Sequence, residues 1–435
     1  MTASGPPFVL KRELGVLGAT AMGLGSIIGT GVFVSIGIAA GAAGPAVILA
    51  TALAAVVAAC NALSSAQLAA GHAVSGGTYE YGYRYLTPEL GFTAGWMFLC
   101  AKTASAATAV LGFSGYLLRL VGGADAWHVP IAVTATTAFT VLVLGGLKQS
   151  SVVNISIVAV TIGSLAIFVL VGLLDLARNG ERTLSPLFPT SGGVGGFFYA
   201  TALMFVAYAG YARIATLGEE IKDPKRNIPL AIIILLLVTA ALYITVAAVA
   251  IGGAGVGVLS RAAERSATPL EAAARALSTP GIGSIIAIGA ITAMLGVLLN
   301  LILGLSRVAL AMGRRGDLPP LFGRLNKDAS APSAAVIGAG LAIGSLALIG
   351  NVQTTWAFSA FSILVYYAIT NLAALRLPKA DRLYPPVIAW SGLGACLFLA
   401  FFVPPPIWLI GLALIGAGLV WHVIARRLWR RGQLE

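Results

Sequence analysis

The chain has 435 residues, of which 58% are hydrophobic and only 10% are charged, and its mean hydropathy is +0.94. A soluble globular protein has about 25% charged residues and a smaller apolar fraction, so this composition excludes a soluble globule and predicts a chain embedded in a lipid bilayer. The net charge of +12 comes from residues scattered over many segments, which argues against a nucleic-acid-binding surface.

Long apolar runs follow one another along the whole chain. A transmembrane helix needs about 20 consecutive apolar residues. The first run is too long and too rich in glycine for a signal peptide, so we expect it to be retained. We therefore predict an all-α polytopic membrane protein that forms one transmembrane domain over residues 1–435. About twelve helices are expected, at residues 14–40, 45–70, 92–120, 129–147, 152–175, 196–218, 229–252, 281–311, 333–350, 354–376, 384–403 and 406–425.

The basic residues predict the orientation of these helices. Cytoplasmic loops collect lysine and arginine, whereas acidic residues count little. If the N-terminus lies inside, eighteen of the 27 lysines and arginines fall in inside segments and only six fall on the opposite side. Both termini are therefore predicted to be cytoplasmic. Because the sequence carries no organelle signal, we expect the cell membrane as the location.

The first apolar run contains a glycine-rich stretch, Gly25 to Phe33. In hydrocarbon an unpaired backbone group costs several kcal/mol, so a helix is interrupted only where the freed groups face a cavity or ligand. If the helix stops near Ile27 and resumes after Gly31, the resumed half presents free amides and a positive dipole end, which suit a carboxylate. Thr30 adds a hydroxyl. The alternative is that the Gly-x-x-x-Gly spacing in this stretch only packs helices closely.

A second weak point, Tyr208 to Tyr211, lies in the sixth run. A break here would release the carbonyls of Val206, Ala207 and Ala209, which could accept hydrogen bonds from an ammonium group. Interrupted helices in corresponding halves of a membrane protein indicate the substrate site of a transporter built from inverted repeats. Together the two breaks predict a receptor for a zwitterion.

Two loops carry signals for helix ends. Thr268 at an N-cap, Pro269 at the first helical position and Glu271 two residues later predict a short helix outside the membrane. In the charged segment after the sixth run, Pro224 and Pro229 are expected to stop a helix.

These stretches resemble the amino acid–polyamine–organocation (APC) transporters. Residues 25–33 are similar to the first-helix signature of that family, and residues 205–211 with the loop 219–229 are similar to its sixth helix and following loop. Residues 306–308 and 312–316 of the eighth run are similar as well. The resemblance covers nearly the whole chain. It implies alternating access, amino acid substrates and a five-plus-five inverted repeat with discontinuous helices 1 and 6. Repeat one would cover about 14–175, repeat two about 196–376, and two peripheral helices about 384–425.

The resemblance also implies roles for individual residues. By position, Ile27, Thr30 and Gly31 would hold the substrate carboxylate. The carbonyls of Val206, Ala207 and Ala209 would hold the amino group. Phe205, Tyr208 and Tyr211 would gate or line the path, with ordinary aromatic packing as the alternative.

The chain departs from the family at two positions linked to charge. Many relatives carry an acidic residue where this chain has Ala212, and proton-coupled relatives often carry a lysine where it has Thr161. The usual proton-linked cation is therefore missing.

Two cations near the predicted site are candidates for coupling, beside the Thr161 position. Lys102 lies about ten residues into the third run, about 15 Å deep at 1.5 Å per residue, where a charge is functional by default. Arg213 follows the second break. The alternatives are contacts with carbonyls or hydroxyls for Lys102, and an ion pair with Glu219 or Glu220 for Arg213.

No acidic side chain falls in the middle of any predicted helix. A dibasic amino acid or a polyamine would leave one cation without a partner, so such substrates are disfavoured. We predict a secondary active transporter of small neutral or anionic amino acids, with protons as the candidate coupling ion. The alternative within the same class is an uncoupled exchanger or facilitator.

Other functional classes lack their chemistry in this sequence. An intramembrane enzyme needs convergent catalytic groups, and a channel needs a pore-lining ring from an oligomer. Cys60, Cys100 and Cys396 show no metal-ligand spacing, so neither a metal nor a cofactor is expected. The sequence leaves the oligomeric state open.

Overall fold

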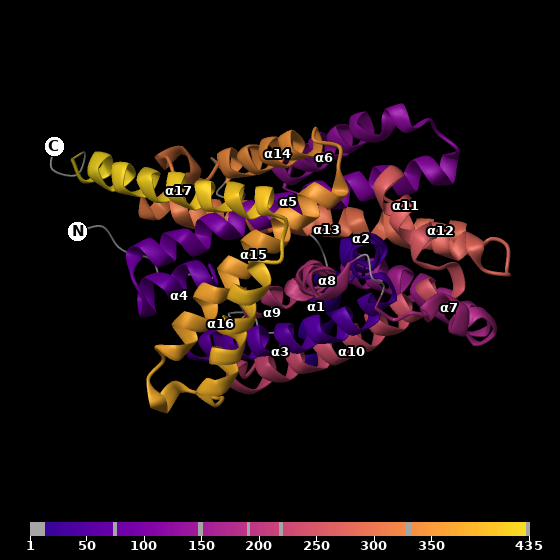
Figure 1. Ribbon diagram of the computed structural model, residues 1–435. Coiled ribbons are helices and arrows are strands. Elements are labelled where there is room, and N and C mark those ends of the chain that lie inside the picture. Colours follow the sequence, from indigo (N-terminus) through magenta and orange to yellow (C-terminus); the bar gives the residue numbers. More distant parts are fainter. Residues whose placement is uncertain are drawn as a thin grey trace.

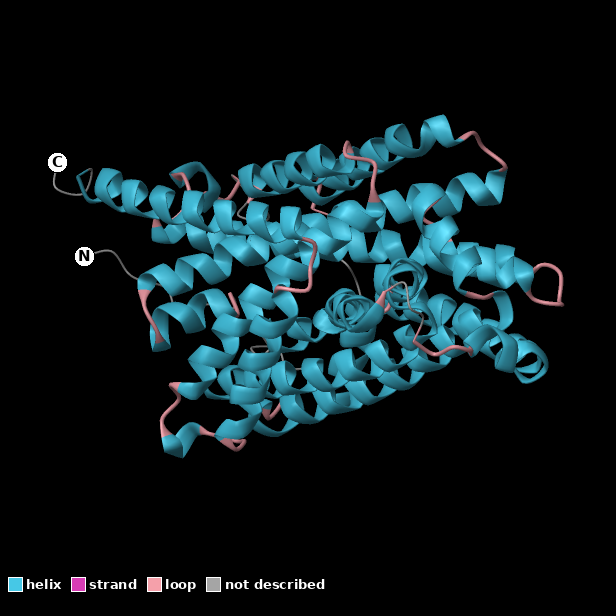
Figure 2. Cartoon of the chain, in the orientation of Figure 1, coloured by secondary structure: helices cyan, strands magenta, loops and turns pink. Residues whose placement is uncertain are grey.

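The apolar runs form helices in the computed structural model, which describes residues 14–72, 76–146, 151–188, 192–216, 221–326 and 332–431. Figure 2 shows these helices joined by short loops, and no β-sheet is present in the described ranges. In chain order the helices are α1 (Val16–Ile27), α2 (Ile36–Ala43), α3 (Val47–Gly71), α4 (Thr78–Tyr85), α5 (Pro88–Val121), α6 (His128–Leu144), α7 (Ser151–Leu184), α8 (Gly193–Tyr208), α9 (Ala212–Thr216), α10 (Pro224–Ala254), α11 (Val256–Arg265), α12 (Pro269–Ala276), α13 (Ile282–Arg315), α14 (Ser333–Ala347), α15 (Val352–Leu375), α16 (Pro386–Ala400) and α17 (Pro405–Arg431).

The prediction of an all-α polytopic membrane protein is confirmed. Among the described residues, nine helical segments are long and apolar enough to cross a bilayer, and Val16–Ile27, Ser333–Ala347 and Pro386–Ala400 are shorter apolar helices. The most enclosed segment is Val352–Leu375, with 78% of its most apolar window buried, whereas the windows of Asp125–Leu144 and Pro405–Leu428 are only 17% buried. A helix whose exposed side is also apolar is suited to contact with lipid.

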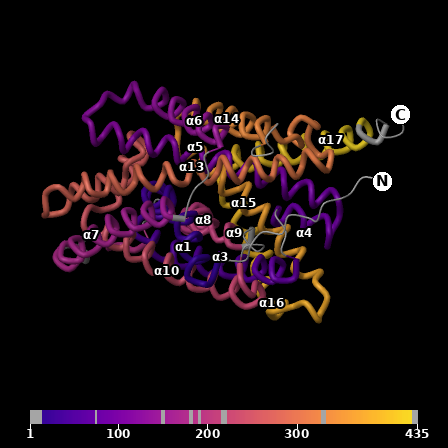
Figure 3. Tube along the Cα trace, turned by 180° about the vertical axis from the view of Figure 1, so that it is seen from behind, coloured from indigo at the N-terminus to yellow at the C-terminus, as the bar shows by residue number. Residues whose placement is uncertain are grey.

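Three pairs of packed helices are five spans apart. Counting α1 with α2 as the first span, α3 packs on α10, α5 on α13 and α6 on α14. Figures 1 and 3 show α6 beside α14 and α5 beside α13 from opposite sides of the bundle. These pairs join the second span with the seventh, the third with the eighth and the fourth with the ninth. This is the pairing that two five-span halves would give; the repeat boundaries themselves stay a prediction.

The helix expected outside the membrane is present, but its cap differs from the prediction. Helix α12 begins at Pro269, as predicted. The Thr268 hydroxyl makes no cap bond to the helix, because it shares a 2.7 Å hydrogen bond with Ser266 Oγ. Glu271 forms an ion pair with Arg275 one turn later. The helix therefore starts on its proline and not on a capping box.

The expectation that Pro229 stops a helix is wrong. Helix α10 starts at Pro224 and runs through Pro229 to Ala254. Pro224 lacks only an amide that would be unpaired in the first turn, and its fixed φ suits a helix start. Pro229 follows within the next turn, where the missing amide costs one backbone bond, and the helix continues.

A buried polar cluster ties three helices together at one end of the bundle. We call this the terminal end, because α17, the last described helix, ends there in Figure 1. Asp317, only 1% exposed, follows α13 and accepts hydrogen bonds of 2.7 Å from both Tyr79 and Tyr83 of α4. On α17, Trp421 Nε1 donates to the Asp317 carbonyl at 2.8 Å, and His422 Nδ1 lies 3.0 Å from Asp317 Oδ1. Burial and the nearby carboxylate raise the pKa of Tyr79 well above its ordinary value, so this hydroxyl stays a donor.

Candidate functional site

The first predicted break is present at the predicted place. Helix α1 ends at Ile27, and Ile28 adopts an extended conformation with φ −78° and ψ 107°. The helical path resumes at Gly31, the first residue of a π-helical turn, η1 (Gly31–Ser35), which continues into α2. The chain is therefore interrupted inside an otherwise apolar span.

The start of the resumed helix has the properties of an anion site. Its first backbone bonds run from the Val32 and Phe33 amides to the Gly29 carbonyl, at 3.1 and 3.2 Å. Amides at a helix N-terminus have no intrahelical acceptor, and the helix dipole is positive there. The Thr30 hydroxyl is buried beside them without a hydrogen-bond partner among the described residues. Buried polar groups in native proteins are normally paired, so this hydroxyl indicates a place for a ligand.

The second break has a different form from the first. Helix α8 ends at Tyr208, and a 3₁₀ turn, η4 (Ala209–Tyr211), leads directly into α9. The Ala209 amide bonds to the Val206 carbonyl, so that carbonyl is paired within the turn. A 3₁₀ turn tightens a helix without opening its backbone. The weak point was placed correctly by the sequence, but the backbone remains helical through it.

Two tyrosines from distant helices bind the carbonyls at the breaks. Tyr243 of α10 donates its hydroxyl to the Ile27 carbonyl at 2.8 Å, and Tyr367 of α15 donates to the Ala209 carbonyl at 3.2 Å. We call them the bracketing tyrosines. The sequence interpretation missed both. A signal was present for Tyr243, which is the one aromatic residue between residues 224 and 254.

The three aromatics predicted to gate or line the path pack on the bracketing tyrosines. Phe205, Tyr208 and Tyr211 are completely buried. The Tyr208 ring lies 5.2 Å from Tyr243, and the Phe205 and Tyr211 rings lie 5.6 and 5.3 Å from Tyr367. Each break is thus held by one tyrosine and at least one aromatic neighbour.

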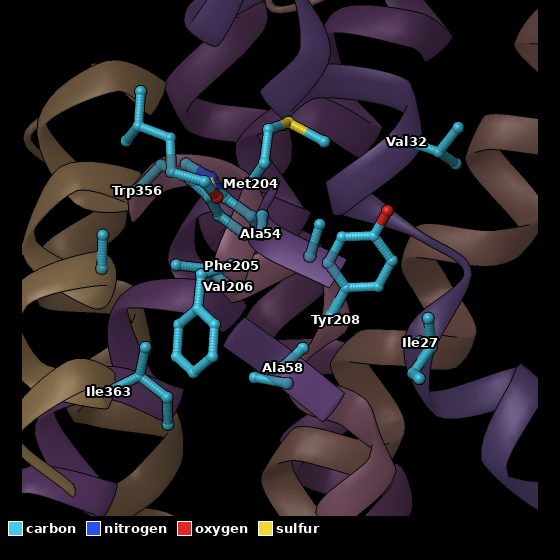
Figure 4. Packing of buried hydrophobic residues seen from close by; sticks show 14 of the residues in the cluster. Ile27, Val32, Ala54, Ala58, Met204, Phe205, Val206, Tyr208, Trp356 and Ile363 are labelled. Carbon is cyan, nitrogen blue, oxygen red and sulfur yellow. Dashed lines mark hydrogen bonds between the residues drawn. The ribbon is translucent and has the colours of Figure 1, made fainter. Parts of the chain in front are cut away.

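Figure 4 shows how these side chains leave α8 in different directions. Tyr208 lies on the side toward Ile27 of the first break, and Phe205 lies on the side toward Ile363 of α15. These residues and Val206 belong to one buried apolar cluster. The second break is therefore packed against the first break on one side and against α15 on the other.

The glycines of the two breaks allow the breaks to touch. A Cβ added to Gly31 would lie 2.5 Å from the Ala207 Cβ, and one added to Gly210 would lie 2.4 Å from the Ser26 carbonyl oxygen. In this conformation the space beside each glycine is filled by the opposite break. Gly25 and Gly29, the pair for which the sequence left close helix packing open, face the side chains of Asn154 and Val297 instead.

A cavity of about 460 Å³ reaches the breaks from the terminal end. Ser26, Ala209 and Gly210 belong to its lining, and so do Gly76 and Gly77 before α4. None of its described lining residues is acidic, and four are cationic: Lys102, Arg213, Arg307 and Arg314. The cavity is therefore an electropositive vestibule that leads to the two breaks.

The three coupling candidates lie in different surroundings. Lys102 stands fourteen residues after the start of α5, about 21 Å along it, and its Nζ lies 6.0 Å from the centre of the Phe98 ring. Lys102 and Arg213 line the same cavity, whereas Thr161 does not. The Thr161 hydroxyl donates to the Ile157 carbonyl at 2.7 Å within α7.

The acidic partners expected for Arg213 and the groups that could bind a metal ion bear on the charge of this site. Glu219 and Glu220, the acids proposed to pair with Arg213, lie outside the described residues. Within the described part of the chain, no three histidine, cysteine, aspartate or glutamate side chains come together in a group that could hold a metal ion.

A family described as amino acid permease matches residues 18–426, which include both breaks and the cavity. The chain belongs to this family. The resemblance to the APC superfamily is thereby confirmed, and the permease is a multi-pass membrane transporter, not an enzyme.

Relatives of the permease match it over nearly their whole length. It is 39% identical to an uncharacterized transporter of Mycobacterium tuberculosis, over 98% of this chain and 94% of the relative. It is 30% identical to a branched-chain amino acid permease of Bacillus subtilis, over 90% and 88% of the two chains. It is 29% identical to a methylthioribose transporter of the same organism, over 96% and 94%.

Proposed function

We propose that this permease moves small neutral or anionic amino acids across the cell membrane by alternating access, with the substrate bound between the two breaks. The observation that carries the proposal is the helix N-terminus at the first break, where an unpartnered, buried Thr30 hydroxyl lies beside free amides. The second break packs against the first, and the vestibule reaches Ser26 near the end of α1 together with Ala209 and Gly210 of the second break.

The proposed site divides the substrate between the two breaks. The carboxylate binds the amides at Thr30 and Gly31, with Ile27 beside them, because backbone donors and the helix dipole favour an anion. The amino group binds carbonyls of the second break, at Val206, Ala207 and Ala209. The Val206 and Ala209 carbonyls already accept one hydrogen bond each, and the second lone pair of each oxygen is the one offered to the ammonium.

Substrate binding requires a movement at this site. Gly31 packs on Ala207, and Gly210 packs on the Ser26 backbone, so the breaks must separate before an amino acid fits between them. Phe205, Tyr208 and Tyr211 pack around the same point and gate that movement. The five-plus-five repeat, with one half moving against the other, is the proposed framework for it.

The proposed orientation places both termini and the vestibule in the cytoplasm. Cytoplasmic segments collect lysine and arginine, and Arg84 lies in α4 while Arg314 and Arg315 end α13, the two helices that the Asp317 cluster joins at the terminal end. The conformation is then open inward. A cysteine placed at the exposed Lys379 should react with a membrane-impermeant maleimide only when the reagent is on the cytoplasmic side.

Proton coupling is the proposed energy source, with Lys102 as its candidate group. Lys102 is a cation deep in a span and lines the route to the site. An uncoupled exchanger is the second candidate, because Thr161 stands where proton-coupled relatives often carry a lysine, and its hydroxyl bonds within its own helix.

Flux into proteoliposomes tests the proposal. Purified permease should take up radiolabelled alanine, leucine or glutamate faster than protein-free vesicles do. Stimulation by an inward proton gradient identifies a symporter, and stimulation only by an amino acid preloaded inside identifies an exchanger. A sodium gradient serves as the control for the other common coupling ion. Absence of binding and flux across a broad amino acid panel would overturn the proposal.

A further inference from the structure

We propose that the vestibule contains a subsite for a second carboxylate, so that the preferred substrate is an acidic amino acid of the glutamate class. This inference rests on the proposed function and adds the charge of the substrate side chain. The subsite is formed chiefly by Lys102 of α5 and Arg307 of α13, which line the same cavity as the second break.

The orientation of the chain in the membrane does not explain why Lys102 and Arg307 are basic. The bias of basic residues toward the cytoplasm concerns loops and helix ends. Lys102 lies about 21 Å into α5, and Arg307 precedes the end of α13 by eight residues. Both lie on long helices that cross the membrane, and both line a cavity that also meets Ala209 and Gly210.

These two cations lack an anion within the described protein. Neither Lys102 nor Arg307 makes an ion pair with a described residue, and no described lining residue carries a carboxylate. Arg213 and Arg314 add positive charge to the same walls. For Lys102, which lies deep in its helix, a charge is costly unless an opposite charge joins it, whereas Arg307 is exposed and open to a ligand that enters the cavity.

A neutral amino acid does not supply that charge. Its carboxylate and ammonium are both used at the breaks, and they cancel each other. A second carboxylate on the side chain gives the substrate a net negative charge, and the vestibule begins where the second break ends. Asn300 also lines this cavity and can donate its side-chain amide to the same carboxylate. An amino acid with a cationic side chain would instead meet four like charges.

A matched pair of substrates isolates the subsite. Glutamate and glutamine have the same length and differ mainly in the charge of the side chain. We expect the purified permease to bind glutamate about tenfold more tightly than glutamine, since hydrogen bonds between charged groups are stronger than neutral ones. Binding is measured by calorimetry in chloride-free and phosphate-free buffer, with aspartate and asparagine as a shorter pair.

Variants then assign the preference to named residues. Lys102→Met and Arg307→Gln should each reduce the ratio of glutamate to glutamine affinity about tenfold by removing a charged partner, while glutamine still binds. Lys379→Met is the matched control, because Lys379 is exposed and does not line the cavity. If Lys102→Met fails to fold, Arg307→Gln, whose side chain is exposed, provides the same test.

The outcomes separate this inference from the proposed function. Equal affinity for glutamate and glutamine would overturn the second subsite and leave an amino acid permease. An unchanged ratio in both variants would overturn it as well. If added chloride or phosphate raised glutamine affinity to the level of glutamate, the cations would serve a separate inorganic anion, and the inference would be wrong. Loss of binding for all amino acids would instead contradict the proposed function.

Discussion

At the first break the chain leaves the helical path at the extended residue Ile28, whereas at the second it stays helical and tightens into a 3₁₀ turn. Both stretches are rich in small residues, yet only the first leaves a helix N-terminus with a buried hydroxyl that has no described partner. The comparison shows that two glycine-containing weak points in one bundle need not expose the same backbone groups. The first break suits an anion, whereas the second break keeps most of its backbone hydrogen bonds.

Adding a methyl group where the two breaks touch should have the largest effect. Gly31→Ala would place a methyl group 2.8 Å from the Ala207 Cα, and Gly210→Ala would place one 2.6 Å from the Ile27 side chain. Overpacking of this kind costs about 1–3 kcal/mol in the free energy of unfolding, and transport should be lost because the two breaks can no longer close on each other.

Thermal unfolding in detergent and flux in vesicles measure these two effects. Gly394→Ala in α16 is the control, since no atom lies within 4 Å of the added methyl group and the helix should be unharmed. Wild-type stability and flux in both break variants would show that the breaks do not touch in the protein.

Removing a bracketing tyrosine hydroxyl should have the next largest effect. Tyr243→Phe and Tyr367→Phe each leave a buried carbonyl without its donor, at a cost of about 1–3 kcal/mol. We expect Tyr243→Phe to cost more, because its bond is 2.8 Å long, compared with 3.2 Å for Tyr367, and because it holds the open break.

Chemical denaturation of the two variants gives the order directly. Tyr199→Phe, also in the membrane, is the control, because its hydroxyl makes no hydrogen bond to a described residue. A larger loss of unfolding free energy in Tyr367→Phe than in Tyr243→Phe would mean that the second break depends more on its tyrosine hydrogen bond than the first break does.

Thr30→Val should have the smallest effect on stability, and in the opposite direction. Its hydroxyl is buried without a described partner, so replacing it with a methyl group should stabilise the substrate-free protein by about 1 kcal/mol. Substrate affinity should fall about tenfold, the loss expected for one hydrogen bond to a charged group.

Thr30→Ser keeps the hydroxyl and should keep the affinity. Parallel measurements of melting temperature and of amino acid binding distinguish the two effects. Unchanged affinity in Thr30→Val would show that only backbone groups bind the carboxylate at the first break.

The helices and the places of both breaks were predictable because their signals are local. Run length fixes a membrane helix, and the stretch after Gly25 marked the end of α1 at Ile27 correctly. Pro269 likewise marked the start of α12. The behaviour of Pro229 was mispredicted, because the loss of one backbone hydrogen bond there does not stop a helix of 31 residues that is held by its packing.

The surroundings of the breaks could not be predicted, because they depend on how distant helices pack. Tyr243 follows Ile27 by 216 residues, and Tyr367 follows Ala209 by 158 residues. Whether Gly31 faces a ligand or Ala207 is decided by the same packing. Lys102 and Arg307 were each visible as cations, but their shared cavity was not.

The cluster around Asp317 also bears on how the chain is made. Trp421 follows Asp317 by 104 residues, so the ribosome has finished α13 long before it delivers the donor for the Asp317 carbonyl. Until then only Tyr79 and Tyr83, synthesised earlier, can hold the carboxylate. Insertion of α17 is therefore a late step in biogenesis that completes the terminal end. A chain truncated after α16 would leave the Asp317 carbonyl without its Trp421 donor and the Asp317 carboxylate without His422 beside it.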